Sequence, residues 1–288
     1  MVYALIDCID KKWIYRLNIN SDAEKINIFL PMFKEKYSDI YAKKVVKILN
    51  KFQISNMVVN QKLLKNQKFC ERLLVENKKI ITGRKMYKTL LMRVLKDISI
   101  QLNVKLEKLK LVFLTEEYSV ENLDLIRWVA PNVKSLSIVT TDKDKFLNLS
   151  EELYKKFGIV LRVYEKDKTN FKYAHILVNI DFLSNDMEKI NMSNKSVVIP
   201  GDAFNYKIKS NFEGILIRKI DIISKENTDM SFDDLAVCEA KVYSSLRRLK
   251  ENDRAFEMNG YRINGYFGEN GKILAEEFKK LGKNILDK

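Results

Sequence analysis

The sequence predicts an α/β protein: a Rossmann-like, mostly parallel sheet flanked by helices, plus a smaller α/β lobe at the N-terminus. Two observations between residues 110 and 200 support this prediction. Short runs rich in β-branched and aromatic residues occur there, and amphipathic helical patterns alternate with them. Such alternation is typical of βαβ units, which build parallel sheets. The runs are Lys110–Leu114, Ser135–Thr140, Val160–Tyr164 and Ile176–Ile180, with Val197–Ile199 as a candidate fifth.

Helix-start and helix-stop signals separate these runs. Ser119 is suited to cap a helix that Pro131 helps to end. Thr141 or Asp142 is suited to cap the next helix, and Gly158 stands where a left-handed C-terminal stop is expected. The spacing therefore favours one helix after each of the first two strands.

The N-terminal lobe is expected to contain both strands and helices. In chain order we expect a strand over 3–9, a hairpin partner over 13–19, a helix from Ser21 or Asp22 towards Phe33, a helix starting at Ser38 or Asp39, a strand over 56–60, a helix over 62–75 and a long helix over 84–102.

Three domains follow from this layout. The first covers residues 1–105 and ends in the long connecting helix, and residues 106–223 form the Rossmann-like domain. Residues 224–288 supply C-terminal helices and a glycine-rich loop, which we expect to pack back on the N-terminal lobe. The loop is distinctive because four of the nine glycines fall within Gly260–Gly271, where Asn-Gly pairs favour turns.

Composition excludes several classes of protein. Hydrophobic residues make up 46% and charged residues 31%, as in globular chains. No apolar run approaches the roughly 18–20 residues needed to span a bilayer. Asp7 and Asp10 interrupt the first apolar stretch, which predicts a strand and not a signal peptide. Cys8, Cys70 and Cys238 lie outside any CxxC pair, so we expect reduced thiols, a cytoplasmic location and no metal site.

The formal net charge of +14 raises the question of nucleic-acid binding. Lysine dominates over arginine and the basic residues are spread along the chain, so a solvated basic surface is the favoured interpretation. Binding of nucleic acid or an acidic partner is the alternative. The densest arginine group, which would suit such a partner, is Arg247, Arg248, Lys250 and Arg254.

Part of the central block is similar to a known family. The similarity is one of layout. A second strand corresponds to SLSIVT, and a polar turn with a helix ending in glycine corresponds to the following TDKDKFLNLSEELYKKFGI. A buried strand that ends in a small polar residue corresponds to the later FKYAHILVNIDF. Over about residues 106–200 the chain resembles the nucleotide-binding domain of the shikimate dehydrogenase and glutamyl-tRNA reductase group. The resemblance implies a Rossmann fold, an NAD(P) cofactor and hydride transfer.

The turn after Lys110–Leu114 departs from that family. The family has a glycine-rich turn there, which lets the main chain approach a diphosphate at a helix N-terminus. This chain has Thr115, Glu116 and Glu117, and two carboxylates would repel a phosphate. The sequence also offers no counterpart of the family's catalytic Lys and Asp pair. NAD(P) is therefore disfavoured, and we expect a non-dehydrogenase module that binds a small ligand or has a regulatory or structural role. The alternative is an NAD(P)-dependent oxidoreductase with an atypical phosphate loop.

Polar residues at the strand ends are the candidate ligand-binding residues, because ligands of open parallel sheets bind there. They are Thr115, Thr140, Thr141, Asp142, Lys143, Asn179 and Asp181. The alternative for Asp142 is a helix cap, and the alternative for Asn179 and Asp181 is a turn after a buried strand. His175 is the single histidine, so multi-histidine metal sites are excluded, and we expect it to be structural. The identity of the small molecule or protein partner and the oligomeric state stay open.

Overall fold

The computed structural model describes residues 3–9, 18–21, 25–166, 170–182, 184–201, 206–207, 211–224, 235–240 and 261–286. Contacts divide the chain into two compact units. The first unit is Met1–Met86 with Ile222–Arg262, and the second is Tyr87–Asp221 with Ile263–Lys288.

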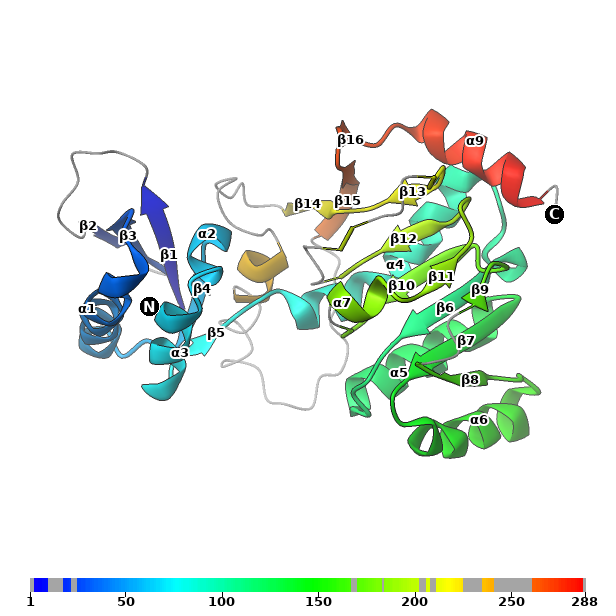
Figure 1. The fold of residues 1–288 in the computed structure, drawn as a ribbon, viewed down its shortest axis with the longest axis horizontal. Helices are drawn as coiled ribbons and strands as arrows, with labels where there is room; N and C mark the ends of the chain where they lie inside the picture. The colour runs from blue at the N-terminus through cyan, green and yellow to red at the C-terminus, as the bar shows by residue number, and fades with distance from the viewer. Residues whose placement is uncertain are drawn as a thin grey trace. The chain divides into compact units, whose positions relative to one another are not determined.

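The first unit contains a five-stranded sheet in the order β2-β3-β1-β4-β5 (Figure 1). The strands are β1 (Tyr3–Ile9), β2 (Asn18–Ser21), β3 (Lys25–Pro31), β4 (Asn56–Val59) and β5 (Lys79–Ile80). They pair in parallel, except that β2 is antiparallel to β3. The helices are the 3-10 turn Glu35–Tyr37, α1 (Ser38–Lys51), α2 (Gln61–Leu64) and α3 (Gln67–Val75).

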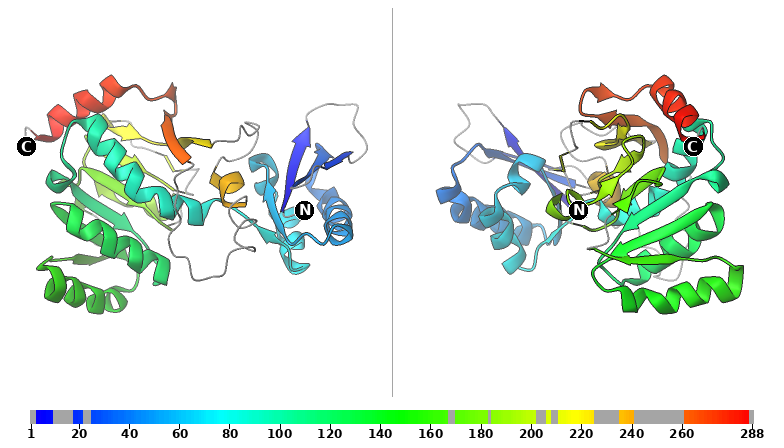
Figure 2. Two further views of the ribbon diagram at one scale, coloured as in Figure 1. Left: turned by 180° about the vertical axis from the view of Figure 1, so that it is seen from behind. Right: turned by 45° about the vertical axis from the view of Figure 1, so that its right-hand side comes forward.

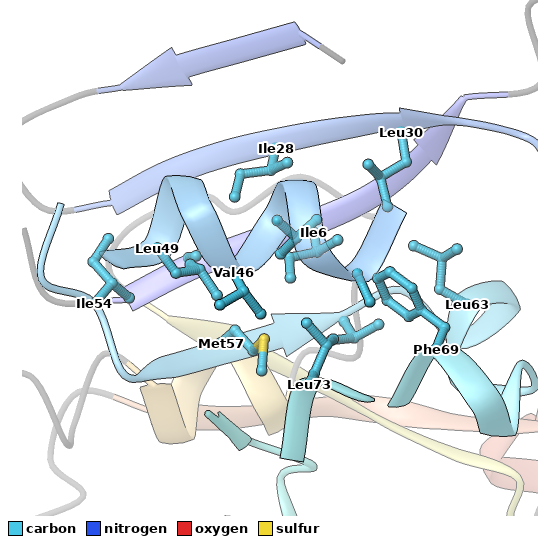
Figure 3. Close-up of a cluster of buried hydrophobic side chains, with 14 of the residues drawn as sticks. Ile6, Ile28, Leu30, Val46, Leu49, Ile54, Met57, Leu63, Phe69 and Leu73 are labelled. Carbon is cyan, nitrogen blue, oxygen red and sulfur yellow. The ribbon is translucent and has the colours of Figure 1, made fainter. Parts of the chain in front are cut away.

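The core of this unit lies between the sheet and its helices (Figure 3). Ile6 and Ile28 from the sheet meet Leu49 from α1 and Phe69 from α3, and all four are fully buried. Burial of such aliphatic and aromatic side chains is the main term that stabilises the unit.

Two expectations for this lobe are wrong. The expected helix towards Phe33 is strand β3, because Ile26, Ile28 and Leu30 are buried at alternate positions, which is the period of a strand. The expected hairpin of 3–9 with 13–19 does not form, because β1 has parallel β3 on one side and parallel β4 on the other. Residues 10–17 lie outside the described part of the chain.

The helical segment 235–240 packs on the first unit. Its Ala236, Val237 and Ala240 are buried in one cluster with side chains of β1 and β4. The approach is close: a Cβ on Gly83 would stand 2.6 Å from the Ala236 nitrogen, and Gly83 has φ +83°, a conformation that favours glycine. The buried Glu239 carboxylate accepts hydrogen bonds from the amides of residues 85 (2.9 Å) and 86 (3.2 Å), in the first turn of α4 (Arg84–Leu102).

The second unit contains a six-stranded parallel sheet, which confirms the predicted Rossmann-like α/β class. Its strands are β6 (Lys110–Leu114), β7 (Ser135–Thr140), β8 (Arg162–Glu165), β10 (Ile176–Asn179), β12 (Val197–Ile199) and β13 (Ile215–Leu216). The spatial order is β13-β12-β10-β6-β7-β8, and every neighbouring pair is parallel. Counted within the sheet, this is the order 3-2-1-4-5-6 of doubly wound dinucleotide-binding folds.

Helices flank both faces of this sheet. They are α4, α5 (Val120–Val129), α6 (Lys143–Phe157) and α7 (Ser184–Met187), with 3-10 turns Leu106–Lys108 and Ala130–Asn132. Figure 2 shows α4 across one face, and Figure 1 shows α7 on the other, beside the two-stranded sheet of β9 (Asn170–Phe171) and β11 (Asn191–Met192). On the α7 face, alternate residues such as Val112, Leu114 and Leu177 form a buried cluster with Phe182 and Met187.

The C-terminal segment packs on the second unit. It contributes to the small sheet β14 (Lys219–Ser224), β15 (Tyr261–Gly268) and β16 (Gly271–Lys272), followed by α9 (Ala275–Leu286). The buried Tyr266 hydroxyl donates to Asp97 of α4 (2.8 Å), and its ring lies 5.6 Å from that of Phe278. Gly282 brings α9 directly onto the Leu102 carbonyl at the end of α4.

Contacts group the chain differently from the expected bounds 1–105, 106–223 and 224–288, and those domain bounds stay a prediction. Most of α4 groups with the second unit, because Tyr266 and the carbonyl of Leu102 tie it to the C-terminal segment. Of the described residues beyond 224, only 235–240 and 261–262 group with the first unit. No helix in the described part of the chain has the length and apolar character required to cross a membrane.

We predict that Gly282→Ala destabilises the protein by about 1–3 kcal/mol, because the new methyl group would collide with the Leu102 carbonyl oxygen. At an open helix position the same change stabilises by about 1 kcal/mol, so the sign is diagnostic. The free energy of unfolding in urea gives the answer, with Lys280→Ala, an exposed position of α9, as the control. A stabilised Gly282→Ala protein would contradict the close packing of α9 on α4.

We also predict a pH-dependent effect of Glu239→Gln. Burial raises the pKa of Glu239 more than the amide bonds from Met86 and Lys85 lower it. The contribution of this carboxyl to stability is therefore full in acid and is lost as the pH rises through its raised pKa. Glutamine keeps an acceptor oxygen but does not ionise.

The expected result is that the stability of Glu239→Gln relative to the wild type increases between about pH 4 and pH 7. Urea unfolding at several pH values measures this difference. A relative stability that falls over the same range would show that the amide bonds outweigh the burial of the charge.

Candidate functional site

The candidate site lies where the strand order of the six-stranded sheet reverses. β6 and β10 are neighbours, and the chain runs from β6 to β7 on one side and from β10 to β12 on the other. A crevice outside the carboxyl ends of the strands forms at such a switch point. Thr115 follows β6 there, and Asp181 follows β10 by two residues.

The Asp181 carboxylate fills the turn after β6. It accepts hydrogen bonds from the main-chain amides of Glu116 (2.6 Å) and Glu117 (3.2 Å). It also accepts from the Thr115 hydroxyl (2.9 Å) and the Asn122 side-chain amide (3.0 Å). Main-chain amides at this turn are the donors that hold a diphosphate in a dinucleotide-binding fold. In this chain two of these amides are bonded to an internal carboxylate.

The donors around Asp181 are held in position by burial and by one another. Thr115 and Asn122 are fully buried. The Asn122 side-chain nitrogen also lies 2.9 Å from the Thr115 hydroxyl oxygen and 2.8 Å from the Glu117 carbonyl oxygen. Ser119 caps α5 by accepting from the Asn122 amide (3.4 Å), as the sequence predicts. These bonds fix the turn to the start of α5.

Each acidic side chain of the turn pairs with a lysine. Lys166, directly after β8, contacts Glu116 at 3.0 Å and Asp186 at 2.7 Å, and Lys88 of α4 contacts Glu117 at 3.6 Å. Burial opposes the charge of Lys166, but the carboxylates of Asp186 and Glu116 outweigh it and raise its pKa. The Lys166 ammonium in turn holds the pKa of Asp186 below its ordinary range. The lysines nearest the turn therefore already have carboxylate partners.

The candidates after β7 form the start of α6. The Thr140 hydroxyl accepts from the Asp142 amide (3.3 Å), and the Asp142 carboxylate accepts from the Lys145 amide (3.4 Å) and pairs with the Lys145 ammonium (2.7 Å). The bond from Lys145 lowers the pKa of Asp142. Asp142 thus acts as a helix cap, the alternative that the sequence left open. Thr141 is exposed and Lys143 is half-buried, and ligand binding by these residues stays a prediction.

Asn179 is committed to the fold. Its side-chain nitrogen donates to the carbonyls of Phe182 (2.9 Å) and Pro200 (2.8 Å), and its side-chain oxygen accepts from the Phe182 amide (2.8 Å). The Tyr87 hydroxyl donates to the Asn179 carbonyl (3.0 Å). With every side-chain group bonded and buried, Asn179 shapes the turn that presents Asp181.

The structure joins Thr115 and Asp181 by a hydrogen bond, and in the described part of the chain no side-chain hydrogen bond joins either of them to another candidate. Arg247, Arg248, Lys250 and Arg254 lie outside the described residues. Sequence reasoning missed Lys166, although its position directly after a strand is the signal that could have found it. It also missed Asn122 and Lys88, which lie within helical patterns and carry no signal of their own. Among the described residues, no group of three or more His, Cys, Asp or Glu side chains could hold a metal ion.

Comparison with known proteins gives no family. No protein-family model and no curated protein matches the chain. Three solved structures illustrate the matches that exist. L-tryptophan dehydrogenase from Nostoc punctiforme is 13% identical with a TM-score of 0.31, and the match covers 68% of this chain and 62% of that one. The chain thus spans less than two thirds of that enzyme.

The second structure is 5-ketofructose reductase of Gluconobacter sp. strain CHM43, with 11% identity, a TM-score of 0.34 and coverage of 99% and 98%. The third is aspartate transcarbamoylase from Trypanosoma cruzi, with 11% identity, a TM-score of 0.27 and coverage of 85% and 79%. None of the three gives a specific link to the shikimate dehydrogenase and glutamyl-tRNA reductase group. At these TM-scores the likeness carries nothing about the activity of this chain.

We predict that Asp181→Ala lowers the free energy of unfolding by about 1–3 kcal/mol, because four donors lose their shared acceptor. Urea unfolding followed by circular dichroism measures the change. Asp144→Ala removes an exposed carboxylate from the first turn of α6 and serves as the control. Equal stabilities of the two variants would contradict a structural role for Asp181.

Proposed function

We propose that this chain is a Rossmann-like module that does not use a dinucleotide and is not a dehydrogenase. It serves in a small-ligand-binding, regulatory or structural role. The predicted cytoplasmic location belongs to this proposal and rests on the sequence. The family resemblance likewise stays a prediction.

One observation carries the proposal: the carboxylate of Asp181 is bonded to the amides of Glu116 and Glu117 at the switch point. A diphosphate would need those same donors. To bind there it would have to displace a carboxylate that also holds Thr115 and Asn122. It would then meet the charge of the displaced carboxylate at close range.

The charges around the turn support the same conclusion. Glu116, Glu117 and Asp186 surround it, and the nearby Lys166 and Lys88 are already paired with them. An anion arriving at the turn would have to compete for each lysine. The rival oxidoreductase reading needs Thr140–Lys145 to grip the adenosine end, yet Asp142 is engaged with Lys145 as a helix cap.

The test is a titration with NADH and NADPH, followed by nicotinamide fluorescence. We expect the wild type to bind neither cofactor more tightly than about 1 mM. Asp181→Asn keeps the size of the side chain and removes its charge, so we expect it to bind NADH measurably better than the wild type. Circular dichroism would verify that this variant is folded.

Two results would contradict the proposal. One is tight NAD(P) binding by the wild type that is lost on substitution of Thr141 or Asp142. The other is equal affinity of the wild type and Asp181→Asn for NADH, which would show that the carboxylate does not block the turn.

A further inference from the structure

A second feature lies at the opposite edge of the same sheet. A pocket of about 420 Å³ opens at the amino ends of the parallel strands of the second unit. It is lined by Lys110, Asn170, Lys172, Tyr173, Ala174, His175, Ser193, Lys195, Asn284 and Ile285. Its walls therefore come from the starts of β6 and β10, from the segments that precede β10 and β12, and from α9. Its volume is within the range of small-molecule sites.

The lining is basic. Lys110, Lys172 and Lys195 all border the pocket, and none of the described residues that line it is an acid. Lys195 has a long contact of 3.8 Å with the exposed Glu213, whereas Lys110 and Lys172 form no ion pair in the described part of the chain. Ammonium groups gathered around a concave surface raise the local concentration of anions.

His175 adds a donor to this wall. Its Nδ1 accepts a hydrogen bond from the Lys110 amide (3.3 Å), so we assign the proton of the neutral ring to Nε2. Burial, Lys110 and Lys134 lower the pKa of His175 to about 4. The ring is therefore neutral at pH 7, mainly because it is buried and also because nearby lysines are positive, and it offers one N–H group.

Uncharged polar groups complete the lining. The buried Ser193 hydroxyl accepts from the Lys195 amide (3.2 Å), which holds the turn before β12. The Tyr173 hydroxyl lies 3.4 Å from the Ser137 hydroxyl. Asn170 and Asn284 offer side-chain amides from two further segments. Such groups suit the hydroxyl groups of a small polar molecule.

We propose that this pocket binds a small molecule that carries a phosphate group. The ammonium groups of Lys110, Lys172 and Lys195 neutralise the phosphate, and the side-chain amides contact the rest of the ligand. A phosphomonoester fits better than a monocarboxylate, because its two negative charges match several separate point charges. This site is distinct from the turn filled by Asp181 and does not depend on the function proposed for that turn.

The first test uses the single histidine of the chain as a reporter. The proton NMR signal of His175 is followed as a function of pH with glucose 6-phosphate, with gluconate and with glucose. The charged groups near the ring are Lys110, Lys134, Lys172 and Lys195, all positive. We expect glucose 6-phosphate to raise the titration midpoint by about one to three units, because a bound anion offsets these charges. Glucose should leave it unchanged.

The second test compares affinities for glucose 6-phosphate by calorimetry. Lys172→Gln and Lys195→Gln should each weaken binding by about tenfold, because each removes one charge-assisted contact. Lys155→Gln is the matched control: it removes the same charge from an exposed position of α6, where Lys155 pairs with Glu151. The control should bind as the wild type does.

Several outcomes would overturn the proposal. Glucose 6-phosphate could leave the His175 signal unchanged, or gluconate could bind as tightly as the phosphate. An equal loss of affinity in Lys155→Gln would show non-specific attraction to a chain of net charge +14. Because Lys155 and Lys172 are exposed and Lys195 is only half-buried, circular dichroism should show every variant folded.

Discussion

The bond between the Asp181 carboxylate and the amides of the turn after β6 is the interaction on which the site depends. Any parallel sheet of this order leaves main-chain donors at that turn. In a dinucleotide-binding fold these donors bind a diphosphate, and glycine residues let the diphosphate come close to the main chain. In this chain a side chain from the turn after the neighbouring strand β10 supplies the oxygen atoms. With these amides already bonded, the side chains of Glu116 and Glu117 extend to Lys166 and Lys88.

The two edges of the sheet consequently differ in charge. At the carboxyl edge, Asp181 is bonded to main-chain amides, and Asp186 and the two glutamates pair with lysines. At the amino edge, Lys110 and Lys172 border a pocket whose described lining residues include no acid. The charged side chains of this unit are therefore unevenly distributed between the two edges of its sheet. A small anion is attracted to one end of the strands and meets carboxylates at the other.

The sequence predicted the elements whose signals are local. The helix Arg84–Leu102, the strands β6, β7 and β10 and the Ser119 cap all follow from spacing and capping residues. It failed at β3, where Ile26, Ile28 and Leu30 alternate but a capping residue suggested a helix. It proposed Thr115 and Asp181 as candidates without pairing them, since 66 positions separate the two in the chain. The pairing of Lys166 was missed for the same reason. Its partners Glu116 and Asp186 are distant in the chain and come close to Lys166 only when the sheet has formed.

The central strands β6 and β10 connect these observations. Their register pairs Ile176 with Leu111 at one end and Asn179 with Leu114 at the other. The ladder continues beyond both ends, because the His175 amide donates to the Lys110 carbonyl and the Ile180 amide donates to the Leu114 carbonyl. A shift of one residue would turn every side chain of these strands to the opposite face and disrupt its packing there, so the register is strongly specified. The same ladder therefore sets the position of His175 against Lys110 and of Asp181 against Thr115, so both edges are built on one rigid pair of strands.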